Sequence, residues 1–447
     1  MRPRPGTSHL ALLGATAALL LGLPGGASAQ DEEDARVARL SVGQRLTLDN
    51  GDLIGVTPLD LTFRSGTRSQ TIEMGFSLPV TQGDPDEDNF IGFGDRQASL
   101  SYRRFTRNAS LEASLNYRES ELDRDIFYDQ DTETLVTLDP GSVAATSARL
   151  GYAFGSQAKL GGEFSLSHSR RDYSGTTDPD LTDNRTSSVD GRIYLEPTPL
   201  IRARILGSAS RTDSDGGTDS RSSQLGAGAS LQVDKVTNLD VEAAWSDIRR
   251  VERDGTEERA KGISVRFSGS RARPDGEYTL SFSSEPGTAG RRDSLMLGRS
   301  LETPRYDLSF NLGATRFRGN IDPIFQIGYD RDLAPNSSIS ASLRQAAVTD
   351  EDGDQAINTD LTVNYSRGLT QRSSMSSSIR YRESRVQSGD AEDARSFAFN
   401  VDYSHTLTQD LSLVAGYSMV RSRDSNGDRN DDDIVFLGIS RDFDFFP

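Results

Sequence analysis

Residues 357–385, INTDLTVNYSRGLTQRSSMSSSIRYRESR, alternate apolar and polar side chains on both sides of a short turn, RGLTQR. Successive side chains of a β-strand point to opposite faces, so this alternation predicts two strands that each have one apolar and one polar face. The turn between them predicts an antiparallel hairpin. The apolar face takes Ile357, Thr359, Leu361, Val363 and Tyr365 from the first strand and Met375, Ile379 and Tyr381 from the second.

The same alternation continues from about residue 36 to Phe445, in segments of roughly ten residues separated by turns. Strands of this length with a single apolar face are typical of a transmembrane β-barrel. The sequence therefore predicts an all-β fold, an antiparallel transmembrane barrel of about 22 strands. The pattern is weakest at 36–80 and 286–318, and the loss of a hairpin there would leave about 18 or 20 strands.

Two kinds of connection separate the segments. The short kind includes 65–69, 106–108, 155–157, 234–238, 369–372 and 407–410, and the long, acidic kind includes 82–89, 119–142, 170–185, 211–221, 349–355 and 424–433. Outer-membrane barrels have short periplasmic turns and longer extracellular loops. We therefore expect the acidic loops outside the cell, and the short turns and both termini in the periplasm.

The first 29 residues have the features of a secretory signal peptide. Arg2 and Arg4 precede an apolar run from Leu10 to Leu23, and Ala27-Ser28-Ala29 is a cleavage site of small residues. We expect two parts, the signal peptide at 1–29 and a single barrel domain at 30–447. Because only about ten residues lie between the cleavage site and the first strand, we expect no plug domain.

The composition agrees with an envelope protein whose strands each have one apolar face although the chain as a whole has few apolar residues. Only 34% of the residues are hydrophobic, the mean hydropathy is −0.55, and there is no cysteine. A barrel needs an apolar residue only at every second position, so its mean hydropathy stays low. The absence of cysteine excludes disulfides, thiolate metal sites and cysteine nucleophiles.

Aromatic residues stand at repeated positions along the pattern. Tyr102, Tyr329, Tyr365 and Tyr403 each come just before a short turn, where a periplasmic aromatic girdle is expected; ordinary cross-strand packing is the alternative. Near the C-terminus, Val435, Leu437, Ile439, Phe443 and Phe445 share one parity. Arg441 interrupts that parity, and it can reach the membrane interface with its long side chain.

The terminal strand, with Phe443 and Phe445, resembles the signal that outer-membrane proteins present to their assembly machinery. The architecture resembles Gram-negative outer-membrane β-barrel proteins over nearly the whole chain after residue 29. The resemblance is to porin-like, poorly characterised families of the envelope. It implies an outer-membrane location, outer-membrane lipid and lipopolysaccharide as surroundings, and the assembly machinery as a partner. Nothing in the sequence indicates nucleic acid or a cofactor, and the oligomeric state is left open.

The polar parity should line the barrel lumen. It is rich in Ser, Asn, Thr, Arg and Asp, and the expected lining residues are Arg266, Asn364, Arg380, Arg382, Asn400 and Asp402. A hydrated lumen without a plug predicts a porin-like channel for small hydrophilic solutes. The alternative is a non-conducting structural or assembly barrel of the envelope, in which Arg and Asp brace the lumen, linked to surface-polysaccharide export.

An enzyme is the third and weakest hypothesis. His168 and His405 both fall on the apolar parity, whereas Ser167 and Ser169 fall on the other, so no Ser-His-Asp site forms on one face. The last long loop contains oxygen ligands in alternation, Asp424, Asn426, Asp428, Asn430 and Asp432, a pattern that Ca²⁺ can use. It does not match an EF-hand loop, and a solvated loop is the simpler interpretation.

Overall fold

The computed structural model describes residues 35–83, 91–122, 126–129, 134–137, 141–176, 181–349, 355–388, 393–424 and 429–445. The chain divides into two units, Met1–Ala35 and Arg36–Pro447, of which the second contains the sheet. The described residues form strands and the turns between them. Within them, no helix has the length and apolar character needed to cross a membrane.

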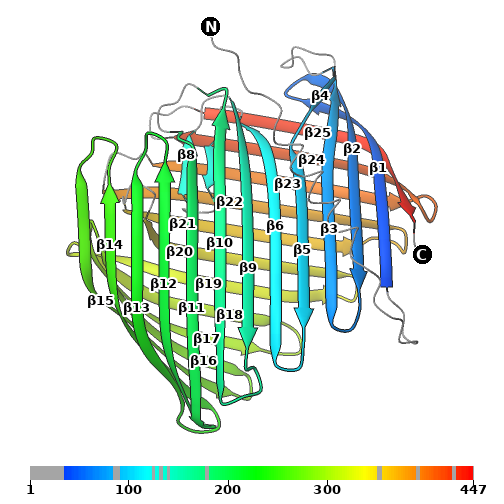
Figure 1. The fold of residues 1–447 in the computed structure, drawn as a ribbon. Coiled ribbons are helices and arrows are strands. Elements are labelled where there is room, and N and C mark those ends of the chain that lie inside the picture. Colours follow the sequence, from blue (N-terminus) through cyan, green and yellow to red (C-terminus); the bar gives the residue numbers. More distant parts are fainter. Residues whose placement is uncertain are drawn as a thin grey trace, which may run out of the picture. The chain divides into compact units, whose positions relative to one another are not determined.

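The described part of the chain contains 25 strands (Figure 1). The first group is β1 (Ala35–Asp49), β2 (Asp52–Gly66), β3 (Gln70–Gln82), β4 (Ile91–Phe93), β5 (Arg96–Phe105), β6 (Ala109–Leu122), β7 (Ile126–Asp129), β8 (Thr134–Thr137), β9 (Gly141–Phe154), β10 (Leu160–Ser174), β11 (Asn184–Thr198) and β12 (Ile201–Ser214). The second is β13 (Asp219–Gln232), β14 (Thr237–Val251), β15 (Glu257–Arg273), β16 (Gly276–Gly287), β17 (Gly290–Glu302), β18 (Asp307–Phe317), β19 (Asn320–Ala334), β20 (Ser337–Thr349), β21 (Gln355–Gly368), β22 (Ser373–Ser388), β23 (Ala394–Thr406), β24 (Leu411–Asp424) and β25 (Arg429–Asp444).

Antiparallel pairing around the sheet closes it into a barrel of 22 strands. β7 and β8 pair only with each other, which leaves 23 strands in the main sheet, and β4 and β5 both pair with β3 as two parts of one interrupted strand. β1 pairs with β25 from Arg39↔Asp444 to Asp49↔Ile434, so no edge is left open. The strand number is the upper value that the sequence predicts.

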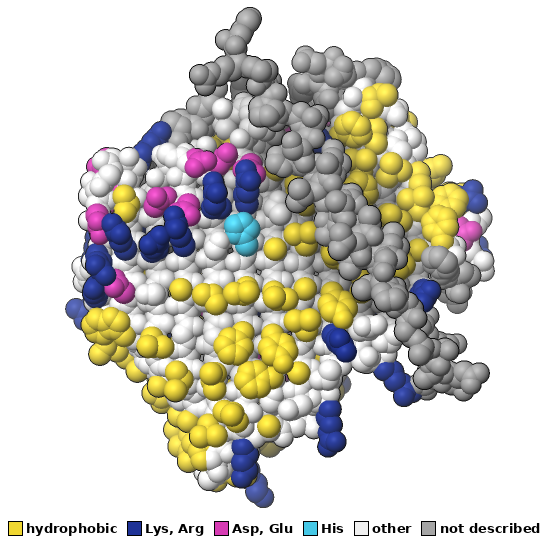
Figure 2. Space-filling model, in the orientation of Figure 1, with side chains coloured by type: hydrophobic (Ala, Val, Ile, Leu, Met, Phe, Trp, Pro, Cys, Tyr) yellow, Lys and Arg dark blue, Asp and Glu magenta, His cyan; other side chains and the backbone are white. Residues whose placement is uncertain are grey.

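The register places the apolar parity on the outside of the barrel. Leu166, Val189, Leu225, Trp245 and Ile263 are exposed, although each is a large apolar side chain. Figure 2 shows such hydrophobic side chains spread over the front wall, below a band where Lys, Arg, Asp and Glu gather. An apolar outer belt bounded by charged residues is the surface that a bilayer requires.

Three connections on the long-loop side are tight turns of two residues rather than long acidic loops. β1 and β2 are joined by Asn50-Gly51, β16 and β17 by residues 288–289, and β18 and β19 by Arg318-Gly319. Asn50 and Gly51 have φ of 46° and 107°, the left-handed conformations that two-residue hairpin turns demand. The division of connections by length is therefore wrong for these three hairpins.

The long connection between β6 and β9 contains the separate hairpin of β7 and β8. This hairpin lies against β22, β23 and β24, which are not neighbours of β6 in the sheet. The hairpin therefore lies against a part of the wall that is distant from β6 in the strand order (Figure 1).

Candidate functional site: the inner wall of the barrel

The inner wall carries the polar parity, and Arg204 of β12 is the centre of a hydrogen-bonded group on it. Its guanidinium donates two hydrogen bonds of 2.6 Å to the two carboxylate oxygens of Asp240, two of 3.0 Å and 3.3 Å to Glu242, and one of 3.1 Å to Ser230. Only 10% of the Arg204 side chain is exposed. A bidentate pair with an additional acceptor is the geometry in which an arginine binds carboxylates most strongly.

A glycine on the intervening strand makes this contact possible. Arg204 lies opposite Gly228 of β13, and Gly228 in turn lies opposite Glu242 of β14. A Cβ on Gly228 would stand 3.0 Å from the Arg204 guanidinium and 2.7 Å from the Val241 carbonyl oxygen. The missing side chain therefore lets Arg204 cross β13 and bind the acids of β14.

Two of the arginines expected in the lumen also bind acids on a neighbouring strand. Arg266 of β15 lies 2.8 Å from Glu285 of β16, and Arg382 of β22 lies 3.2 Å from Asp360 of β21. Arg380 is exposed, and it lies opposite Thr362 and Ala398. The inner wall thus combines braced arginines with at least one that is open to a ligand.

The remaining expected lining residues lie in a shallow serine-rich pocket or beside it. Asn364 lies 3.4 Å from Ser340, and Asn400 lies 3.4 Å from Ser378. Asp402 joins Asn364 in the lining of a pocket of about 380 Å³, most of which is formed by serines of β20, β21 and β22. Hydroxyl and amide groups of this kind hydrogen-bond a polar ligand from several directions.

The four tyrosines expected in the girdle lie near the ends of β5, β19, β21 and β23, each followed by a short turn. The ring of Tyr329 lies 6.2 Å from that of Tyr306.

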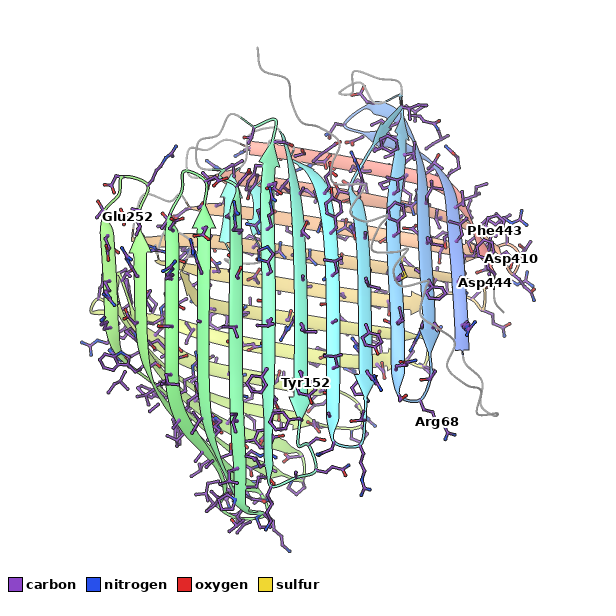
Figure 3. All side chains as sticks on the ribbon, viewed as in Figure 1. Arg68, Tyr152, Glu252, Asp410, Phe443 and Asp444 are labelled. Atoms are coloured by element: carbon purple, nitrogen blue, oxygen red, sulfur yellow. The ribbon has the colours of Figure 1, made fainter. Side chains whose placement is uncertain are left out.

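Figure 3 shows Phe443, Asp410 and Asp444 close together where the first and last strands meet. The guanidinium of Arg441 lies 4.9 Å from the ring of Phe443. Whether these residues work as a girdle and an assembly signal stays a prediction.

The oxygen-rich loop before β25 is only partly described. Asn426 and Asp428 lie outside the described residues, whereas Asp424 ends β24 and Asn430 belongs to β25. Asp432 accepts a hydrogen bond of 3.0 Å from the Asn50 amide, across the seam that closes the barrel. No group of acids or histidines suited to a metal ion occurs among the residues that are described.

Two aspartates in the short turns have pKa values below the ordinary range. The backbone N–H of Val236 and the Thr237 hydroxyl stabilise the charged form of Asp234 and lower its pKa. The Arg299 guanidinium, 2.7 Å away, lowers the pKa of Asp275. Both carboxylates therefore stay charged through the neutral range, and they fix turns rather than transfer protons.

Comparison with known proteins reveals similarity at the level of structure alone. No family model matches the chain, and no curated protein matches it by sequence. The ferric-catecholate import receptor Fiu from E. coli K12 matches over 93% of this chain and 82% of its own, with 10% identity and a TM-score of 0.58. The siderophore receptor PirA from Acinetobacter baumannii covers 93% and 81% with 8% identity and a TM-score of 0.60. The FrpB iron transporter from Neisseria meningitidis covers 92% and 83% with 8% identity and a TM-score of 0.59.

The chain has the fold of a Gram-negative outer-membrane β-barrel. The resemblance found in the sequence is therefore confirmed for the fold. Its porin-like part is wrong, because the matching barrels are receptors and transporters for import, not porins and not assembly barrels. Neither the solute channel nor the structural barrel linked to polysaccharide export is retained. The matching proteins are also not enzymes.

The sequence predicts a barrel of the kind that has no plug domain, and the matching structures contradict this prediction too. The matching receptors have a plug domain in addition to the barrel, and 18–19% of their chains lie outside the match with this one. A short segment before the first strand therefore does not distinguish a porin from a receptor barrel. Strand number separates the two classes of barrel better, because porins have 16–18 strands whereas 22-stranded outer-membrane transporters have a plugged lumen.

Proposed function

We propose that this protein is the barrel of a receptor-type import system of the outer membrane, which takes up a polar, negatively charged iron chelate. The observation that carries the proposal is the closed antiparallel barrel of 22 strands. A barrel of this size is too wide for a simple sieve of small solutes, and it is the size that outer-membrane transporters use.

The proposed class of ligand follows from the chemistry of the inner wall and from the barrels that match it. Those barrels include receptors for a ferric catecholate and for ferric enterobactin. A ferric catecholate is anionic and rich in oxygen, so it needs cations and hydrogen-bond donors. Arg380 supplies exposed positive charge, Arg266 adds a guanidinium that stays exposed while it binds Glu285, and the serines beside Asn364 supply hydroxyl groups.

The same proposal covers the route to the membrane and the surroundings there. Residues 1–29 act as the signal peptide, 30–447 form one barrel domain, and Phe443 and Phe445 present the terminal strand to the assembly machinery. The outer membrane then surrounds the apolar belt with lipid, and lipopolysaccharide faces its outer half. The charged band above the belt supports this placement, because charged residues lie at the level of the headgroups.

Binding and uptake of defined ferric chelates test the proposal. The purified barrel should bind a ferric catecholate in equilibrium dialysis, and a deletion strain should take up less of the radioactive iron chelate than the complemented strain. Arg266→Gln/Arg380→Gln should weaken binding about tenfold for each lost charge-assisted hydrogen bond. Arg104→Gln/Arg271→Gln, which removes the same charge from the outer wall, should leave binding unchanged. A folded wild-type barrel that binds no ferric chelate of any class would refute the proposal.

A further inference from the structure

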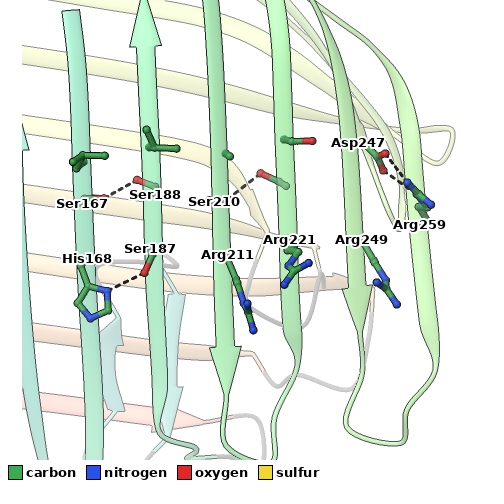
Figure 4. Close-up of a pocket in the computed structure, with 15 residues that line it drawn as sticks. Ser167, His168, Ser187, Ser188, Ser210, Arg211, Arg221, Asp247, Arg249 and Arg259 are labelled. Atoms are coloured by element: carbon green, nitrogen blue, oxygen red, sulfur yellow. Dashed lines mark hydrogen bonds and ion pairs between the residues drawn. The ribbon is translucent and has the colours of Figure 1, made fainter.

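A line of cationic side chains crosses six adjacent strands on the outer wall, just above the apolar belt. The register places His168 of β10 opposite Ser187, Ser187 opposite Arg211, Arg211 opposite Arg221, Arg221 opposite Arg249, and Arg249 opposite Arg259 of β15. We call His168, Arg211, Arg221, Arg249 and Arg259 the basic row. Figure 4 shows its four arginines side by side on neighbouring strands.

Four arginines in consecutive cross-strand positions are unfavourable without an anion. Neighbouring strands lie about 4.8 Å apart, and like charges directly opposite each other destabilise a sheet. Acids of the adjacent rows compensate in part: Arg211 binds Asp213, Arg249 binds Glu257 and Arg259 binds Asp247. No carboxylate within the described residues pairs with Arg221, at the centre of the row. The basic row therefore retains uncompensated positive charge.

The basic row borders a groove of about 780 Å³ on the outer wall. Four arginines and Asp247 line the groove, and Asp213 and Glu257 next to it pair with two of the arginines, so the net charge there is +1 with His168 neutral. The small side chains of Ala209 and Ser223 leave room for the groove, and Leu166 and Val189 form its apolar border. The groove is thus cationic on one side and apolar on the other, which suits an amphipathic anion rather than a free ion.

The apolar belt continues directly below the groove. Leu225, Trp245 and Ile263 follow on β13, β14 and β15, one outward-facing row further down, and all are exposed on the wall. The outward-facing row next below the basic row is apolar on β10 and β11, with Leu166 and Val189, and charged on β14 and β15, with Asp247 and Lys261. At about 3.4 Å per residue, the basic row stands roughly 7 Å above this mixed row and roughly 14 Å above the Trp245 row. A lipid that places its phosphate at the basic row can therefore lay its acyl chains along this belt.

We infer that the basic row is a binding site for the phosphorylated lipid A part of lipopolysaccharide. The row lies at the end of the barrel where β10 and β12 enter their acidic loops, the end that we expect outside the cell. Lipopolysaccharide presents phosphate groups immediately above its acyl chains, at the level of this row. Arg guanidinium groups bind phosphate with paired, charge-assisted hydrogen bonds.

Binding of defined lipids to a barrel refolded without lipopolysaccharide tests the inference. Wild-type protein should retain added lipopolysaccharide in size-exclusion chromatography. Arg221→Gln/Arg249→Gln should bind it about 25-fold more weakly, at about fivefold for each cation near an anionic surface. The matched control Arg104→Gln/Arg271→Gln removes two exposed arginines from the outward parity at the other end of the barrel, and should bind as wild type does.

A second variant keeps the inference testable if Arg221→Gln/Arg249→Gln fails to fold. Arg221→Lys/Arg249→Lys keeps the charge, and should bind lipopolysaccharide within a few-fold of wild type, so a loss as large as that of the Gln pair would overturn a charge-based site. Equal binding by the Gln pair and wild type would also overturn the inference. So would phosphatidylglycerol micelles that bind as tightly as lipopolysaccharide, or inorganic phosphate that displaces it at equal concentration. None of these outcomes bears on ferric chelate binding, which depends on the inner wall.

Discussion

Gly228 is the residue on which the inner-wall cluster of Arg204, Asp240 and Glu242 depends. Gly228→Ala should destabilise the barrel by about 1–3 kcal/mol, because the new Cβ stands where the Arg204 guanidinium crosses β13 and too close to the Val241 carbonyl oxygen. Urea unfolding in lipid vesicles measures the change in the free energy of unfolding.

Gly207 of β12 is the matched control for this substitution. A Cβ at Gly207 would meet its nearest neighbours at 3.7 Å, an ordinary contact. Gly207→Ala should therefore leave stability unchanged or raise it by up to about 1 kcal/mol, since alanine restricts the unfolded chain. Equal losses at the two glycines would show that the cluster of Arg204 does not limit stability.

The sequence predicts the face of each residue in this cluster but not the contacts. Glu242 lies opposite Arg266, which the alternation places in the lumen, so the cluster shares the face of the expected lining residues. A shift of register by two residues keeps every side chain on its face and changes every partner. The contact between Arg204 and strand β14 therefore depends on a register that alternation does not determine. The basic row cannot be predicted from the sequence either, because its arginines come from four separate segments and meet only in the correct register.

At the scale of one strand, β21 tests the assignment of the two faces. Val363→Arg should cost roughly 2–4 kcal/mol, because it places a cation on the lipid-facing wall near mid-membrane. Asn364→Arg, one residue further along, should be tolerated, because Asn364 lies on the serine-lined inner wall. Unfolding of both variants in lipid vesicles gives the comparison, and similar losses would contradict the assigned faces.

The turns show where sequence reasoning was accurate and where it was not. Segment 357–385 forms β21 and β22 with the expected turn, because its alternation is strict and long. The hairpin of β1 and β2 lies in residues 36–80, where the alternation is weakest. Asn50-Gly51 is itself a strong signal for a two-residue hairpin, because both residues adopt positive φ easily. That pair alone predicts the position of the hairpin.

At the scale of the molecule, the two ends of the barrel should face different compartments. Asp215 lies between β12 and β13, and Gln371 lies between β21 and β22 at the other end. A cysteine at Asp215 should react with a membrane-impermeant maleimide on intact cells, and one at Gln371 should react only after the outer membrane is opened. The natural chain has no cysteine, so the signal has one source. The reverse pattern of labelling would mean an inverted barrel.

The class of transporter could not be inferred from parity, because alternation gives the same outward face in a porin and in a receptor. Barrel width differs between them, and width depends on strand number. The sequence gives that number only within a hairpin or two, because boundaries of weak strands are uncertain. The pairing of β4 and β5 with β3 and the closure by β25 fix the strand number at 22.

Closure is the property of the whole molecule that a single experiment can test. Ser41 of β1 donates a hydrogen bond of 2.7 Å to Asp442 of β25, so the two side chains meet across the seam. Oxidised Ser41→Cys/Asp442→Cys should therefore form a disulfide that joins the ends of the chain and changes its mobility in denaturing electrophoresis until reductant is added. Ser41→Cys/Phe443→Cys should not, because residue 443 faces the other side of the wall and lies opposite Leu40. Cross-linking of both pairs would indicate a mobile seam, and cross-linking of neither would mean that β1 and β25 do not close the barrel in this register.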